Sequence, residues 1–167
     1  MTFALYDAAA PVFVRGLNVL DGLIDKAVAS GLDEAGLMEA RLAPDMKPFP
    51  DQIRMATFSA RAAVARLTGT DIPFMEDDET SLAQLKDRIA RSRAFVQSIE
   101  PAAFAGAETR PVTMKFPGHV LEFEGAGYLT SFAIPNFYFH VTTAYAILRK
   151  EGVALGKQDF LGQLALV

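Results

Sequence analysis

The chain has 167 residues, of which 51% are hydrophobic and 22% are charged, with a net charge of -4 and no cysteine. This length and composition predict one folded domain over residues 1–167 and exclude a disordered chain, a disulfide framework and any zinc site that uses sulfur. The acidic balance, without a basic block, also argues against nucleic acid as a partner.

The first helix is predicted over residues 4–29, where apolar side chains recur at steps of three and four residues and so share one face. Pro11 is expected in its first turns or at a kink, because proline has no backbone N–H. After this helix, Asp33 is expected to cap a short one. No basic residues precede the apolar residues of the N-terminus, so no secretory signal is visible and a cytoplasmic protein is expected.

Two further long helices are predicted over residues 50–68 and 81–99. The first of these has a stripe of small residues, which allows a neighbouring helix to approach closely. Gly69 is its expected stop. The segment between the two helices is typical of a loop, and its acidic run, residues 76–79, is expected to be a solvated connection and not a binding site.

A β-hairpin is predicted over residues 112–124, where the apolar period changes from about 3.6 residues to 2. If Pro117 and Gly118 form the turn, the pairs that face one another on one side are Val112 with Phe123, Met114 with Leu121, and Phe116 with His119. Proline cannot adopt the positive φ that the favoured two-residue turns require, so a longer loop with a shifted register is the alternative.

The last long helix, predicted over residues 128–151, carries apolar and aromatic side chains on several faces and should therefore lie centrally in a bundle. Pro135 should kink it or divide it into two pieces. Its apolar run is too short and too interrupted to cross a bilayer, which needs roughly 20 residues, so no membrane partner is expected. Together with the apolar tail, this helix offers more hydrophobic surface than three partner helices would cover, which predicts a homodimer.

Three polar side chains are the candidates for a site. Asn136 and His140 are four residues apart and share one helix face, and Gln52, near the start of the second long helix, is the nearest third polar group. We expect the three to converge in a pocket with Tyr138 and Tyr145 that holds a small molecule. A simpler interpretation competes with this one, because a single histidine on an apolar face is usually a hydrogen-bonded core residue. No glycine-rich phosphate loop, nucleophile elbow or paired-histidine zinc motif is present.

Three segments of the sequence carry a resemblance to a known family: LYDAAAPVFVRGL, RLAPDMKPFPDQIRMAT and PNFYFHVTTAYAILRKEGVALGKQDFLG. They resemble the bacterial family called domain of unknown function nineteen-ninety-three, over nearly the whole chain. That family belongs with the DinB/YfiT-like superfamily, so the resemblance implies a mainly α, four-helix bundle with a small β-hairpin before the last long helix. Better-known members of the superfamily are metalloenzymes and thiol-dependent transferases, including mycothiol-dependent maleylpyruvate isomerase and bacillithiol transferases.

The resemblance also bears on metal binding. Superfamily members with metal carry three histidines, one from the second helix and an H-x-x-x-H pair in the last long helix. Alignment on the shared Leu-Arg and Gly ending places Asn136 at the first histidine of the pair and His140 at the second. The second helix has no histidine, and Gln52 is the closest polar substitute. The resemblance therefore carries over only His140, as a remnant ligand, and does not imply tight binding of zinc or nickel.

Two functions are compatible with this sequence. The favoured one is a bundle with a degenerate metal site that binds a small molecule or acts as a dimeric, non-catalytic protein, because two of the three ligands are missing. The alternative is a metal- or thiol-dependent transferase or hydrolase that uses His140 as a general base or weak metal ligand in a pocket between helices. Metal analysis of the purified protein separates the two.

Overall fold

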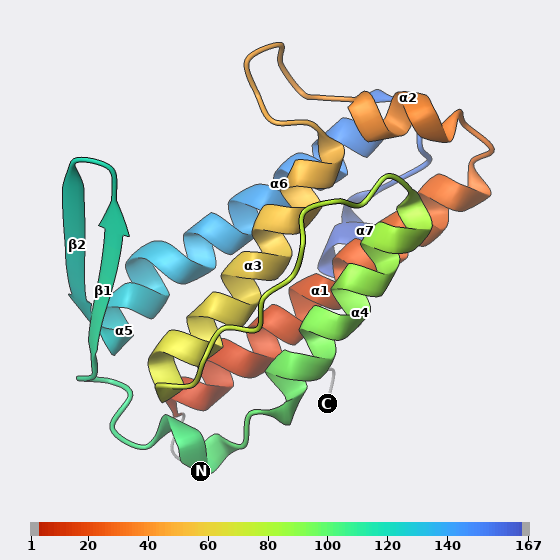
Figure 1. Ribbon diagram of the computed structural model, residues 1–167. Coiled ribbons are helices and arrows are strands. Elements are labelled where there is room, and N and C mark those ends of the chain that lie inside the picture. Colours follow the sequence, from red (N-terminus) through yellow and green to blue (C-terminus); the bar gives the residue numbers. More distant parts are fainter. Residues whose placement is uncertain (1–3, 165–167) are drawn as a thin grey trace.

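The computed structural model describes residues 4–164, which form a bundle of four long helices with a small hairpin at one end (Figure 1). The long helices are α1 (Leu5–Ala29), α3 (Phe49–Thr68), α4 (Leu82–Ser98) and α6 (Ile134–Lys150). The short elements are α2 (Glu34–Glu39), a 3₁₀ turn (Pro101–Phe104), β1 (Pro111–Phe116), β2 (His119–Glu124), α5 (Gly125–Tyr128), the π-helical turn η2 (Leu129–Ala133) and α7 (Lys157–Leu161). The predicted mainly α bundle with a hairpin before the last long helix is confirmed.

The order of the helices explains a long loop on the outside of the bundle. Helix α3 lies between α4 and α6, and α1 completes the bundle between those two. Helices α3 and α4 run in the same direction, so the chain must return along the length of the bundle to connect them (Figure 1). Residues 69–81 make this return, and a crossover connection of this kind is an established variant of the four-helix bundle. The loop therefore lies along the outer side of the bundle.

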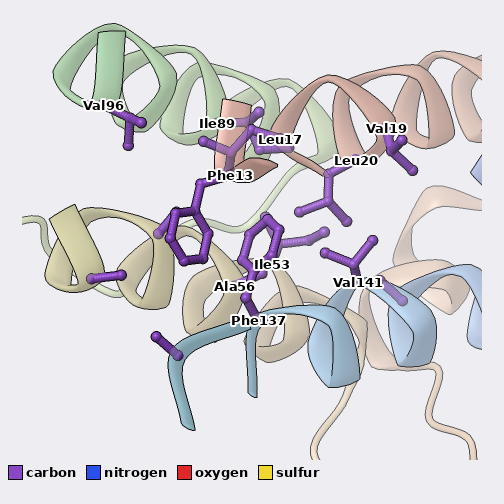
Figure 2. Packing of buried hydrophobic residues seen from close by; sticks show 14 of the residues in the cluster. Phe13, Leu17, Val19, Leu20, Ile53, Ala56, Ile89, Val96, Phe137 and Val141 are labelled. Atoms are coloured by element: carbon purple, nitrogen blue, oxygen red, sulfur yellow. The ribbon is translucent and has the colours of Figure 1, made fainter. Parts of the chain in front are cut away.

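The hydrophobic core lies between the four long helices. Figure 2 shows Phe13 and Leu20 of α1 facing Ile53 of α3 and Phe137 of α6. The rings of Phe13 and Phe137 meet edge to face, with their centroids 5.1 Å apart, an arrangement that aromatic pairs prefer. Gly16 is buried beside them, and a side chain there would overlap the Phe137 ring. The lack of a side chain at this position therefore lets α1 and α6 pack closely.

The hairpin has the register that the sequence predicts for a two-residue turn. Its facing pairs include Val112 with Phe123 and Met114 with Leu121. Gly118 has a φ of 83°, and a proline followed by such a glycine is the pattern of a type II turn. Because Gly118 alone supplies the positive φ, Pro117 keeps its ordinary conformation and no longer loop is needed.

The helix around Pro135 changes its type and does not break. Helix α5, the π turn η2 and α6 follow one another without interruption, and Pro135 lies in the first turn of α6. In a π turn the hydrogen bonds reach one residue further than in an α-helix, so the turn holds about one extra residue. The predicted division into two pieces therefore does not occur. The helix instead changes from π-helical to α-helical geometry next to Pro135.

The C-terminal tail packs on the same chain through α7; residues 165–167 of the predicted apolar tail lie outside the described residues. Helix α7 contacts α1, where Arg15 Nε donates to the Leu161 carbonyl at 3.1 Å and Lys26 pairs with Asp159 at 2.7 Å. The tail thus covers part of the surface on which the homodimer was predicted, and the homodimer stays a prediction. Within residues 4–164, no helix has the length and apolar composition of a membrane span.

Candidate functional site

A cavity of about 640 Å³ opens between α3 and α6. The loop of residues 69–81, strand β1, α5 and η2 supply its other walls, and α4 contributes Arg88. Six of its apolar lining residues are Met55, Phe58, Phe74, Met75, Met114 and Phe116. Cavities that bind small molecules in proteins have volumes of roughly 300–1,000 Å³, mainly apolar walls and a few placed polar groups. The cavity has the size and lining of such a site.

His140 is the titratable group on the α6 side of this cavity, and its hydrogen bond fixes its tautomer. Its Nδ1 lies 2.9 Å from Gln52 Oε1. The Gln52 amide nitrogen donates to the Lys47 carbonyl at 2.9 Å, so the amide oxygen must face the ring and Nδ1 must carry the proton. Burial lowers the pKa of His140 below its ordinary value of 6.5. At neutral pH the ring is therefore uncharged, with an unprotonated Nε2 that can accept a hydrogen bond or a proton.

Two further hydrogen bonds link α3 to the continuous helix formed by α5, η2 and α6. Asn136 Nδ2 donates to Ser59 Oγ at 2.8 Å, and Arg66 Nη1 donates to Tyr128 Oη at 2.9 Å. On α3 the three linking residues are spaced by seven, close to two α-helical turns, and so share one face; they are Gln52, Ser59 and Arg66.

The opposite helix reaches the same alignment only because of its π turn. Asn136 lies one turn from His140, but Tyr128 lies eight residues before Asn136. Two α-helical turns take about seven residues. The π turn between Tyr128 and Asn136 holds about one more, so the two side chains share a face.

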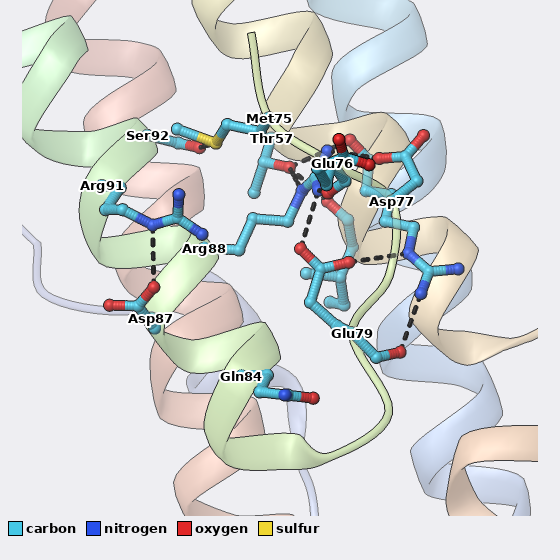
Figure 3. Close-up of polar contacts among 12 residues, drawn as sticks. Thr57, Met75, Glu76, Asp77, Glu79, Gln84, Asp87, Arg88, Arg91 and Ser92 are labelled. Atoms are coloured by element: carbon cyan, nitrogen blue, oxygen red, sulfur yellow. Dashed lines mark hydrogen bonds and ion pairs between the residues drawn. The ribbon is translucent and has the colours of Figure 1, made fainter.

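The charged part of the lining consists of four arginines and one aspartate, and a glutamate lies directly behind it. Two of the arginines share Glu79: Arg54 Nε lies 2.9 Å from Oε2, and Arg88 Nη1 lies 2.8 Å from Oε1 (Figure 3). Burial alone would raise the pKa of Glu79, but hydrogen bonds from Arg88 and Arg54 outweigh it and lower the pKa. The prediction of a solvated acidic run is therefore wrong for Glu79, whose side chain is only 4% exposed.

The structure brings some of the predicted site residues together and separates others. Asn136 and His140 line the cavity, whereas Gln52 is buried behind His140. The expectation for Tyr138 and Tyr145 needs correction, because both rings contact Phe160 of α7 and neither is part of the cavity lining. Successive residues of an α-helix are rotated by about 100°, so positions two and five residues beyond a lining residue fall on other faces.

The side chains at the positions of the superfamily's metal ligands do not fit a tight zinc or nickel site. One imidazole and two neutral amides stand where three imidazoles would be needed. The Gln52 oxygen, the atom by which that amide could bind a metal, already accepts a hydrogen bond from His140 Nδ1. Among the residues that the structure describes, no three histidine, aspartate or glutamate side chains gather as a metal site would require.

Replacing His140 with phenylalanine should reduce the loss of stability that occurs as the pH falls below 6.5, the ordinary pKa of histidine. The lowered pKa of His140 means that the unfolded chain takes up a proton more readily than the folded one. The uncharged ring of His140 therefore contributes stability above pH 6.5. This contribution is lost as the pH falls through the pKa that His140 has in the folded protein. Urea unfolding at several pH values measures how the free energy of unfolding depends on pH. His119→Phe, at an exposed position, is the control; parallel profiles for His140→Phe and the wild type would contradict the assignment.

Sequence reasoning missed Ser59, Arg61 and Arg66 as lining residues. A signal for two of them was present, because Gln52, Ser59 and Arg66 are polar residues that recur every seven positions along α3. For Arg61 no comparable signal exists, since the partner that holds its Nη1, the Pro73 carbonyl, comes from the loop of residues 69–81.

Comparisons with known proteins agree with this architecture. The model of the family described as Domain of unknown function (DUF1993) matches residues 5–161, which include every residue of the cavity lining. The crystal structure of a DinB family member protein from Shewanella denitrificans is similar to this chain with a TM-score of 0.88 and 38% identity. The alignment covers 98% of this chain and 94% of that one. No curated protein matches.

Proposed function

Since the chain belongs to the DUF1993 family and has the fold of a DinB family member, we propose that it binds a small, mainly apolar molecule in the cavity between α3 and α6. The observation that carries this proposal is the cavity of about 640 Å³, whose aromatic and methionine walls meet a few polar groups. Apolar walls supply affinity through the removal of apolar surface from water, and isolated polar groups orient the ligand.

The polar groups on α6 suit a ligand that donates a hydrogen bond. The hydrogen bond to Gln52 leaves His140 Nε2 as an acceptor. Asn136 uses its amide nitrogen on Ser59, so its amide oxygen is the atom that can accept from a ligand. A hydroxyl, amine or thiol of the ligand would therefore be held at the α6 wall.

Catalysis is the second candidate function, and the fixed tautomer of His140 favours it. A neutral imidazole whose other nitrogen is held by a hydrogen bond is the usual form of a general base. In a transferase or hydrolase, Nε2 would take the proton of a bound thiol or hydroxyl as that group attacks an electrophilic carbon of a second substrate, and would return the proton to the leaving group as the old bond breaks. Such a step requires the proton donor to lie about 2.6–3.2 Å from Nε2.

Methionine methyl groups allow binding at this cavity to be tested directly. Met55, Met75 and Met114 line it, whereas Met38 and Met46 do not. Titration with N-phenyl-1-naphthylamine, an uncharged aromatic probe, should shift the methyl NMR signals of the three lining methionines, because a bound aromatic ring changes the magnetic field at nearby methyl groups. The signals of Met38 and Met46 serve as internal controls in the same sample.

Two results would contradict the proposal. One is that neither the probe nor its sulfonated analogue binds at millimolar concentration. The other is that binding shifts the signals of Met38 and Met46 while those of the three lining methionines stay unchanged. Substitution of each methionine by leucine assigns the signals, and this replacement changes side-chain volume little.

A further inference from the structure

Arg61 is a buried cation in the cavity wall with neutral partners only. Its side chain lines the cavity and is 1% exposed. Its Nε donates to the Thr57 carbonyl at 3.3 Å, and its Nη1 donates to the Pro73 carbonyl. Among the residues that the structure describes, no carboxylate lies within ion-pair distance of this guanidinium. Arg54 and Arg88, in contrast, both pair with Glu79.

A buried charge of this kind is costly to hold. Backbone carbonyls satisfy N–H groups, but they do not neutralise a full charge, and buried charges in proteins are normally paired. Burial, followed by repulsion from Arg88, lowers the pKa of Arg61 to about 10, so the group stays protonated at neutral pH. The charge of Asp77 on the loop acts to raise the pKa of Arg61, but its carboxylate pairs with Arg88 Nη2 at 2.8 Å.

Arg66 adds a second cation to the same cavity. Its guanidinium donates to the Tyr128 hydroxyl and lies 5.7 Å from the centre of the Tyr128 ring. In residues 4–164 it has no ion-pair partner either. Two guanidiniums from α3, Arg61 and Arg66, therefore line a mainly apolar cavity with neutral groups as their hydrogen-bond partners.

We infer that the ligand of this cavity is an amphipathic organic anion, with an aromatic or acyl body and a carboxylate, sulfonate or phosphate group beside Arg61. This inference rests on the proposed function and adds the chemical class of the ligand. An anion would form charge-assisted hydrogen bonds with the guanidinium. An uncharged ligand would instead leave the buried charge without compensation.

Two probes that differ by one charged group test the inference. The compound 8-anilinonaphthalene-1-sulfonate has the aromatic skeleton of N-phenyl-1-naphthylamine and adds a sulfonate. The wild-type protein should bind the sulfonate at least about tenfold more tightly, since a hydrogen bond to a charged group contributes roughly 1.5–3 kcal/mol and 1.4 kcal/mol corresponds to tenfold. Calorimetry gives both affinities, and the methyl signals of Met55, Met75 and Met114 report whether the sulfonate occupies the cavity.

The Arg61→Gln variant should lose about tenfold in affinity for the sulfonate and keep its affinity for the uncharged probe within about twofold. Arg91→Gln is the matched control, because it removes the same charge from a side chain that is 53% exposed and outside the cavity lining. Binding of the uncharged probe also reports that the cavity of each variant is intact. If Arg61→Gln does not fold, Arg66→Gln, at a half-buried position, should lose about threefold for the sulfonate alone.

The outcomes separate the two proposals. Failure of both probes to bind would reject the proposed function. Binding of the uncharged probe with no preference for the sulfonate would overturn the inference alone. A preference for the sulfonate that neither Arg61→Gln nor Arg66→Gln reduces would overturn it as well.

Discussion

Replacing Glu79 with glutamine should lower the free energy of unfolding by about 3–5 kcal/mol. The Glu79 carboxylate is the shared partner of Arg54 and Arg88, and its side chain is 4% exposed. Removing one member of a buried ion pair leaves the other charge without compensation, which typically costs about 3–5 kcal/mol. Urea unfolding at pH 7, monitored by circular dichroism, measures the change.

An exposed ion pair on α4, the helix that carries Arg88, provides the control. Asp87 and Arg91 pair at 2.7 Å with side chains that are 65% and 53% exposed. Because water already solvates both groups, Asp87→Asn should change the free energy of unfolding by less than about 0.5 kcal/mol. A loss below about 1 kcal/mol for Glu79→Gln would mean that the buried network contributes little to stability.

Gly16→Ala should lower the free energy of unfolding by about 1–2 kcal/mol. An alanine methyl group there would overlap the ring of Phe137 in the core between α1 and α6. Overpacking of a core usually costs about 1–3 kcal/mol, and the better helix propensity of alanine offsets up to about 1 kcal/mol of that cost. The urea midpoint of the variant should fall accordingly.

Gly22 offers the matched comparison within α1. It is exposed, and an added methyl group would meet no other atom within 4 Å. Gly22→Ala should therefore stabilise the protein by about 0.5–1 kcal/mol through helix propensity alone. Equal effects of the two substitutions would show that packing at Gly16 is not close enough to matter.

The fold was largely predictable because its signals are local. Periodic apolar residues give the long helices within a few residues of their ends: α1, predicted over 4–29, spans Leu5–Ala29, and α3, predicted over 50–68, spans Phe49–Thr68. The alternation of apolar and polar residues, together with the turn residues Pro117 and Gly118, predicts the hairpin and its register. These patterns depend on neighbours within one element, and one sequence displays them fully.

The cavity was less predictable because its parts come from distant elements. The acidic run of residues 76–79 looks the same in sequence whether Glu79 meets water or two arginines. Only the direction of α4 relative to α3 brings the loop back against Arg54 and Arg88. The sequence also does not show which neighbour each face of α6 contacts. The spacing of apolar residues alone does not reveal that Tyr138 and Tyr145 contact α7.

The π turn sets the rotational phase of everything that precedes it in the last helix. One residue corresponds to about 100° of rotation around a helix axis, so the extra residue in Leu129–Ala133 turns α5 by about that amount relative to α6. The hairpin ends directly at α5, so it turns with α5. The position of Met114 and Phe116 in the cavity wall therefore depends on the extra residue in the π turn. Deletion of one residue from that turn would rotate the hairpin about the helix axis and away from its present position beside α3.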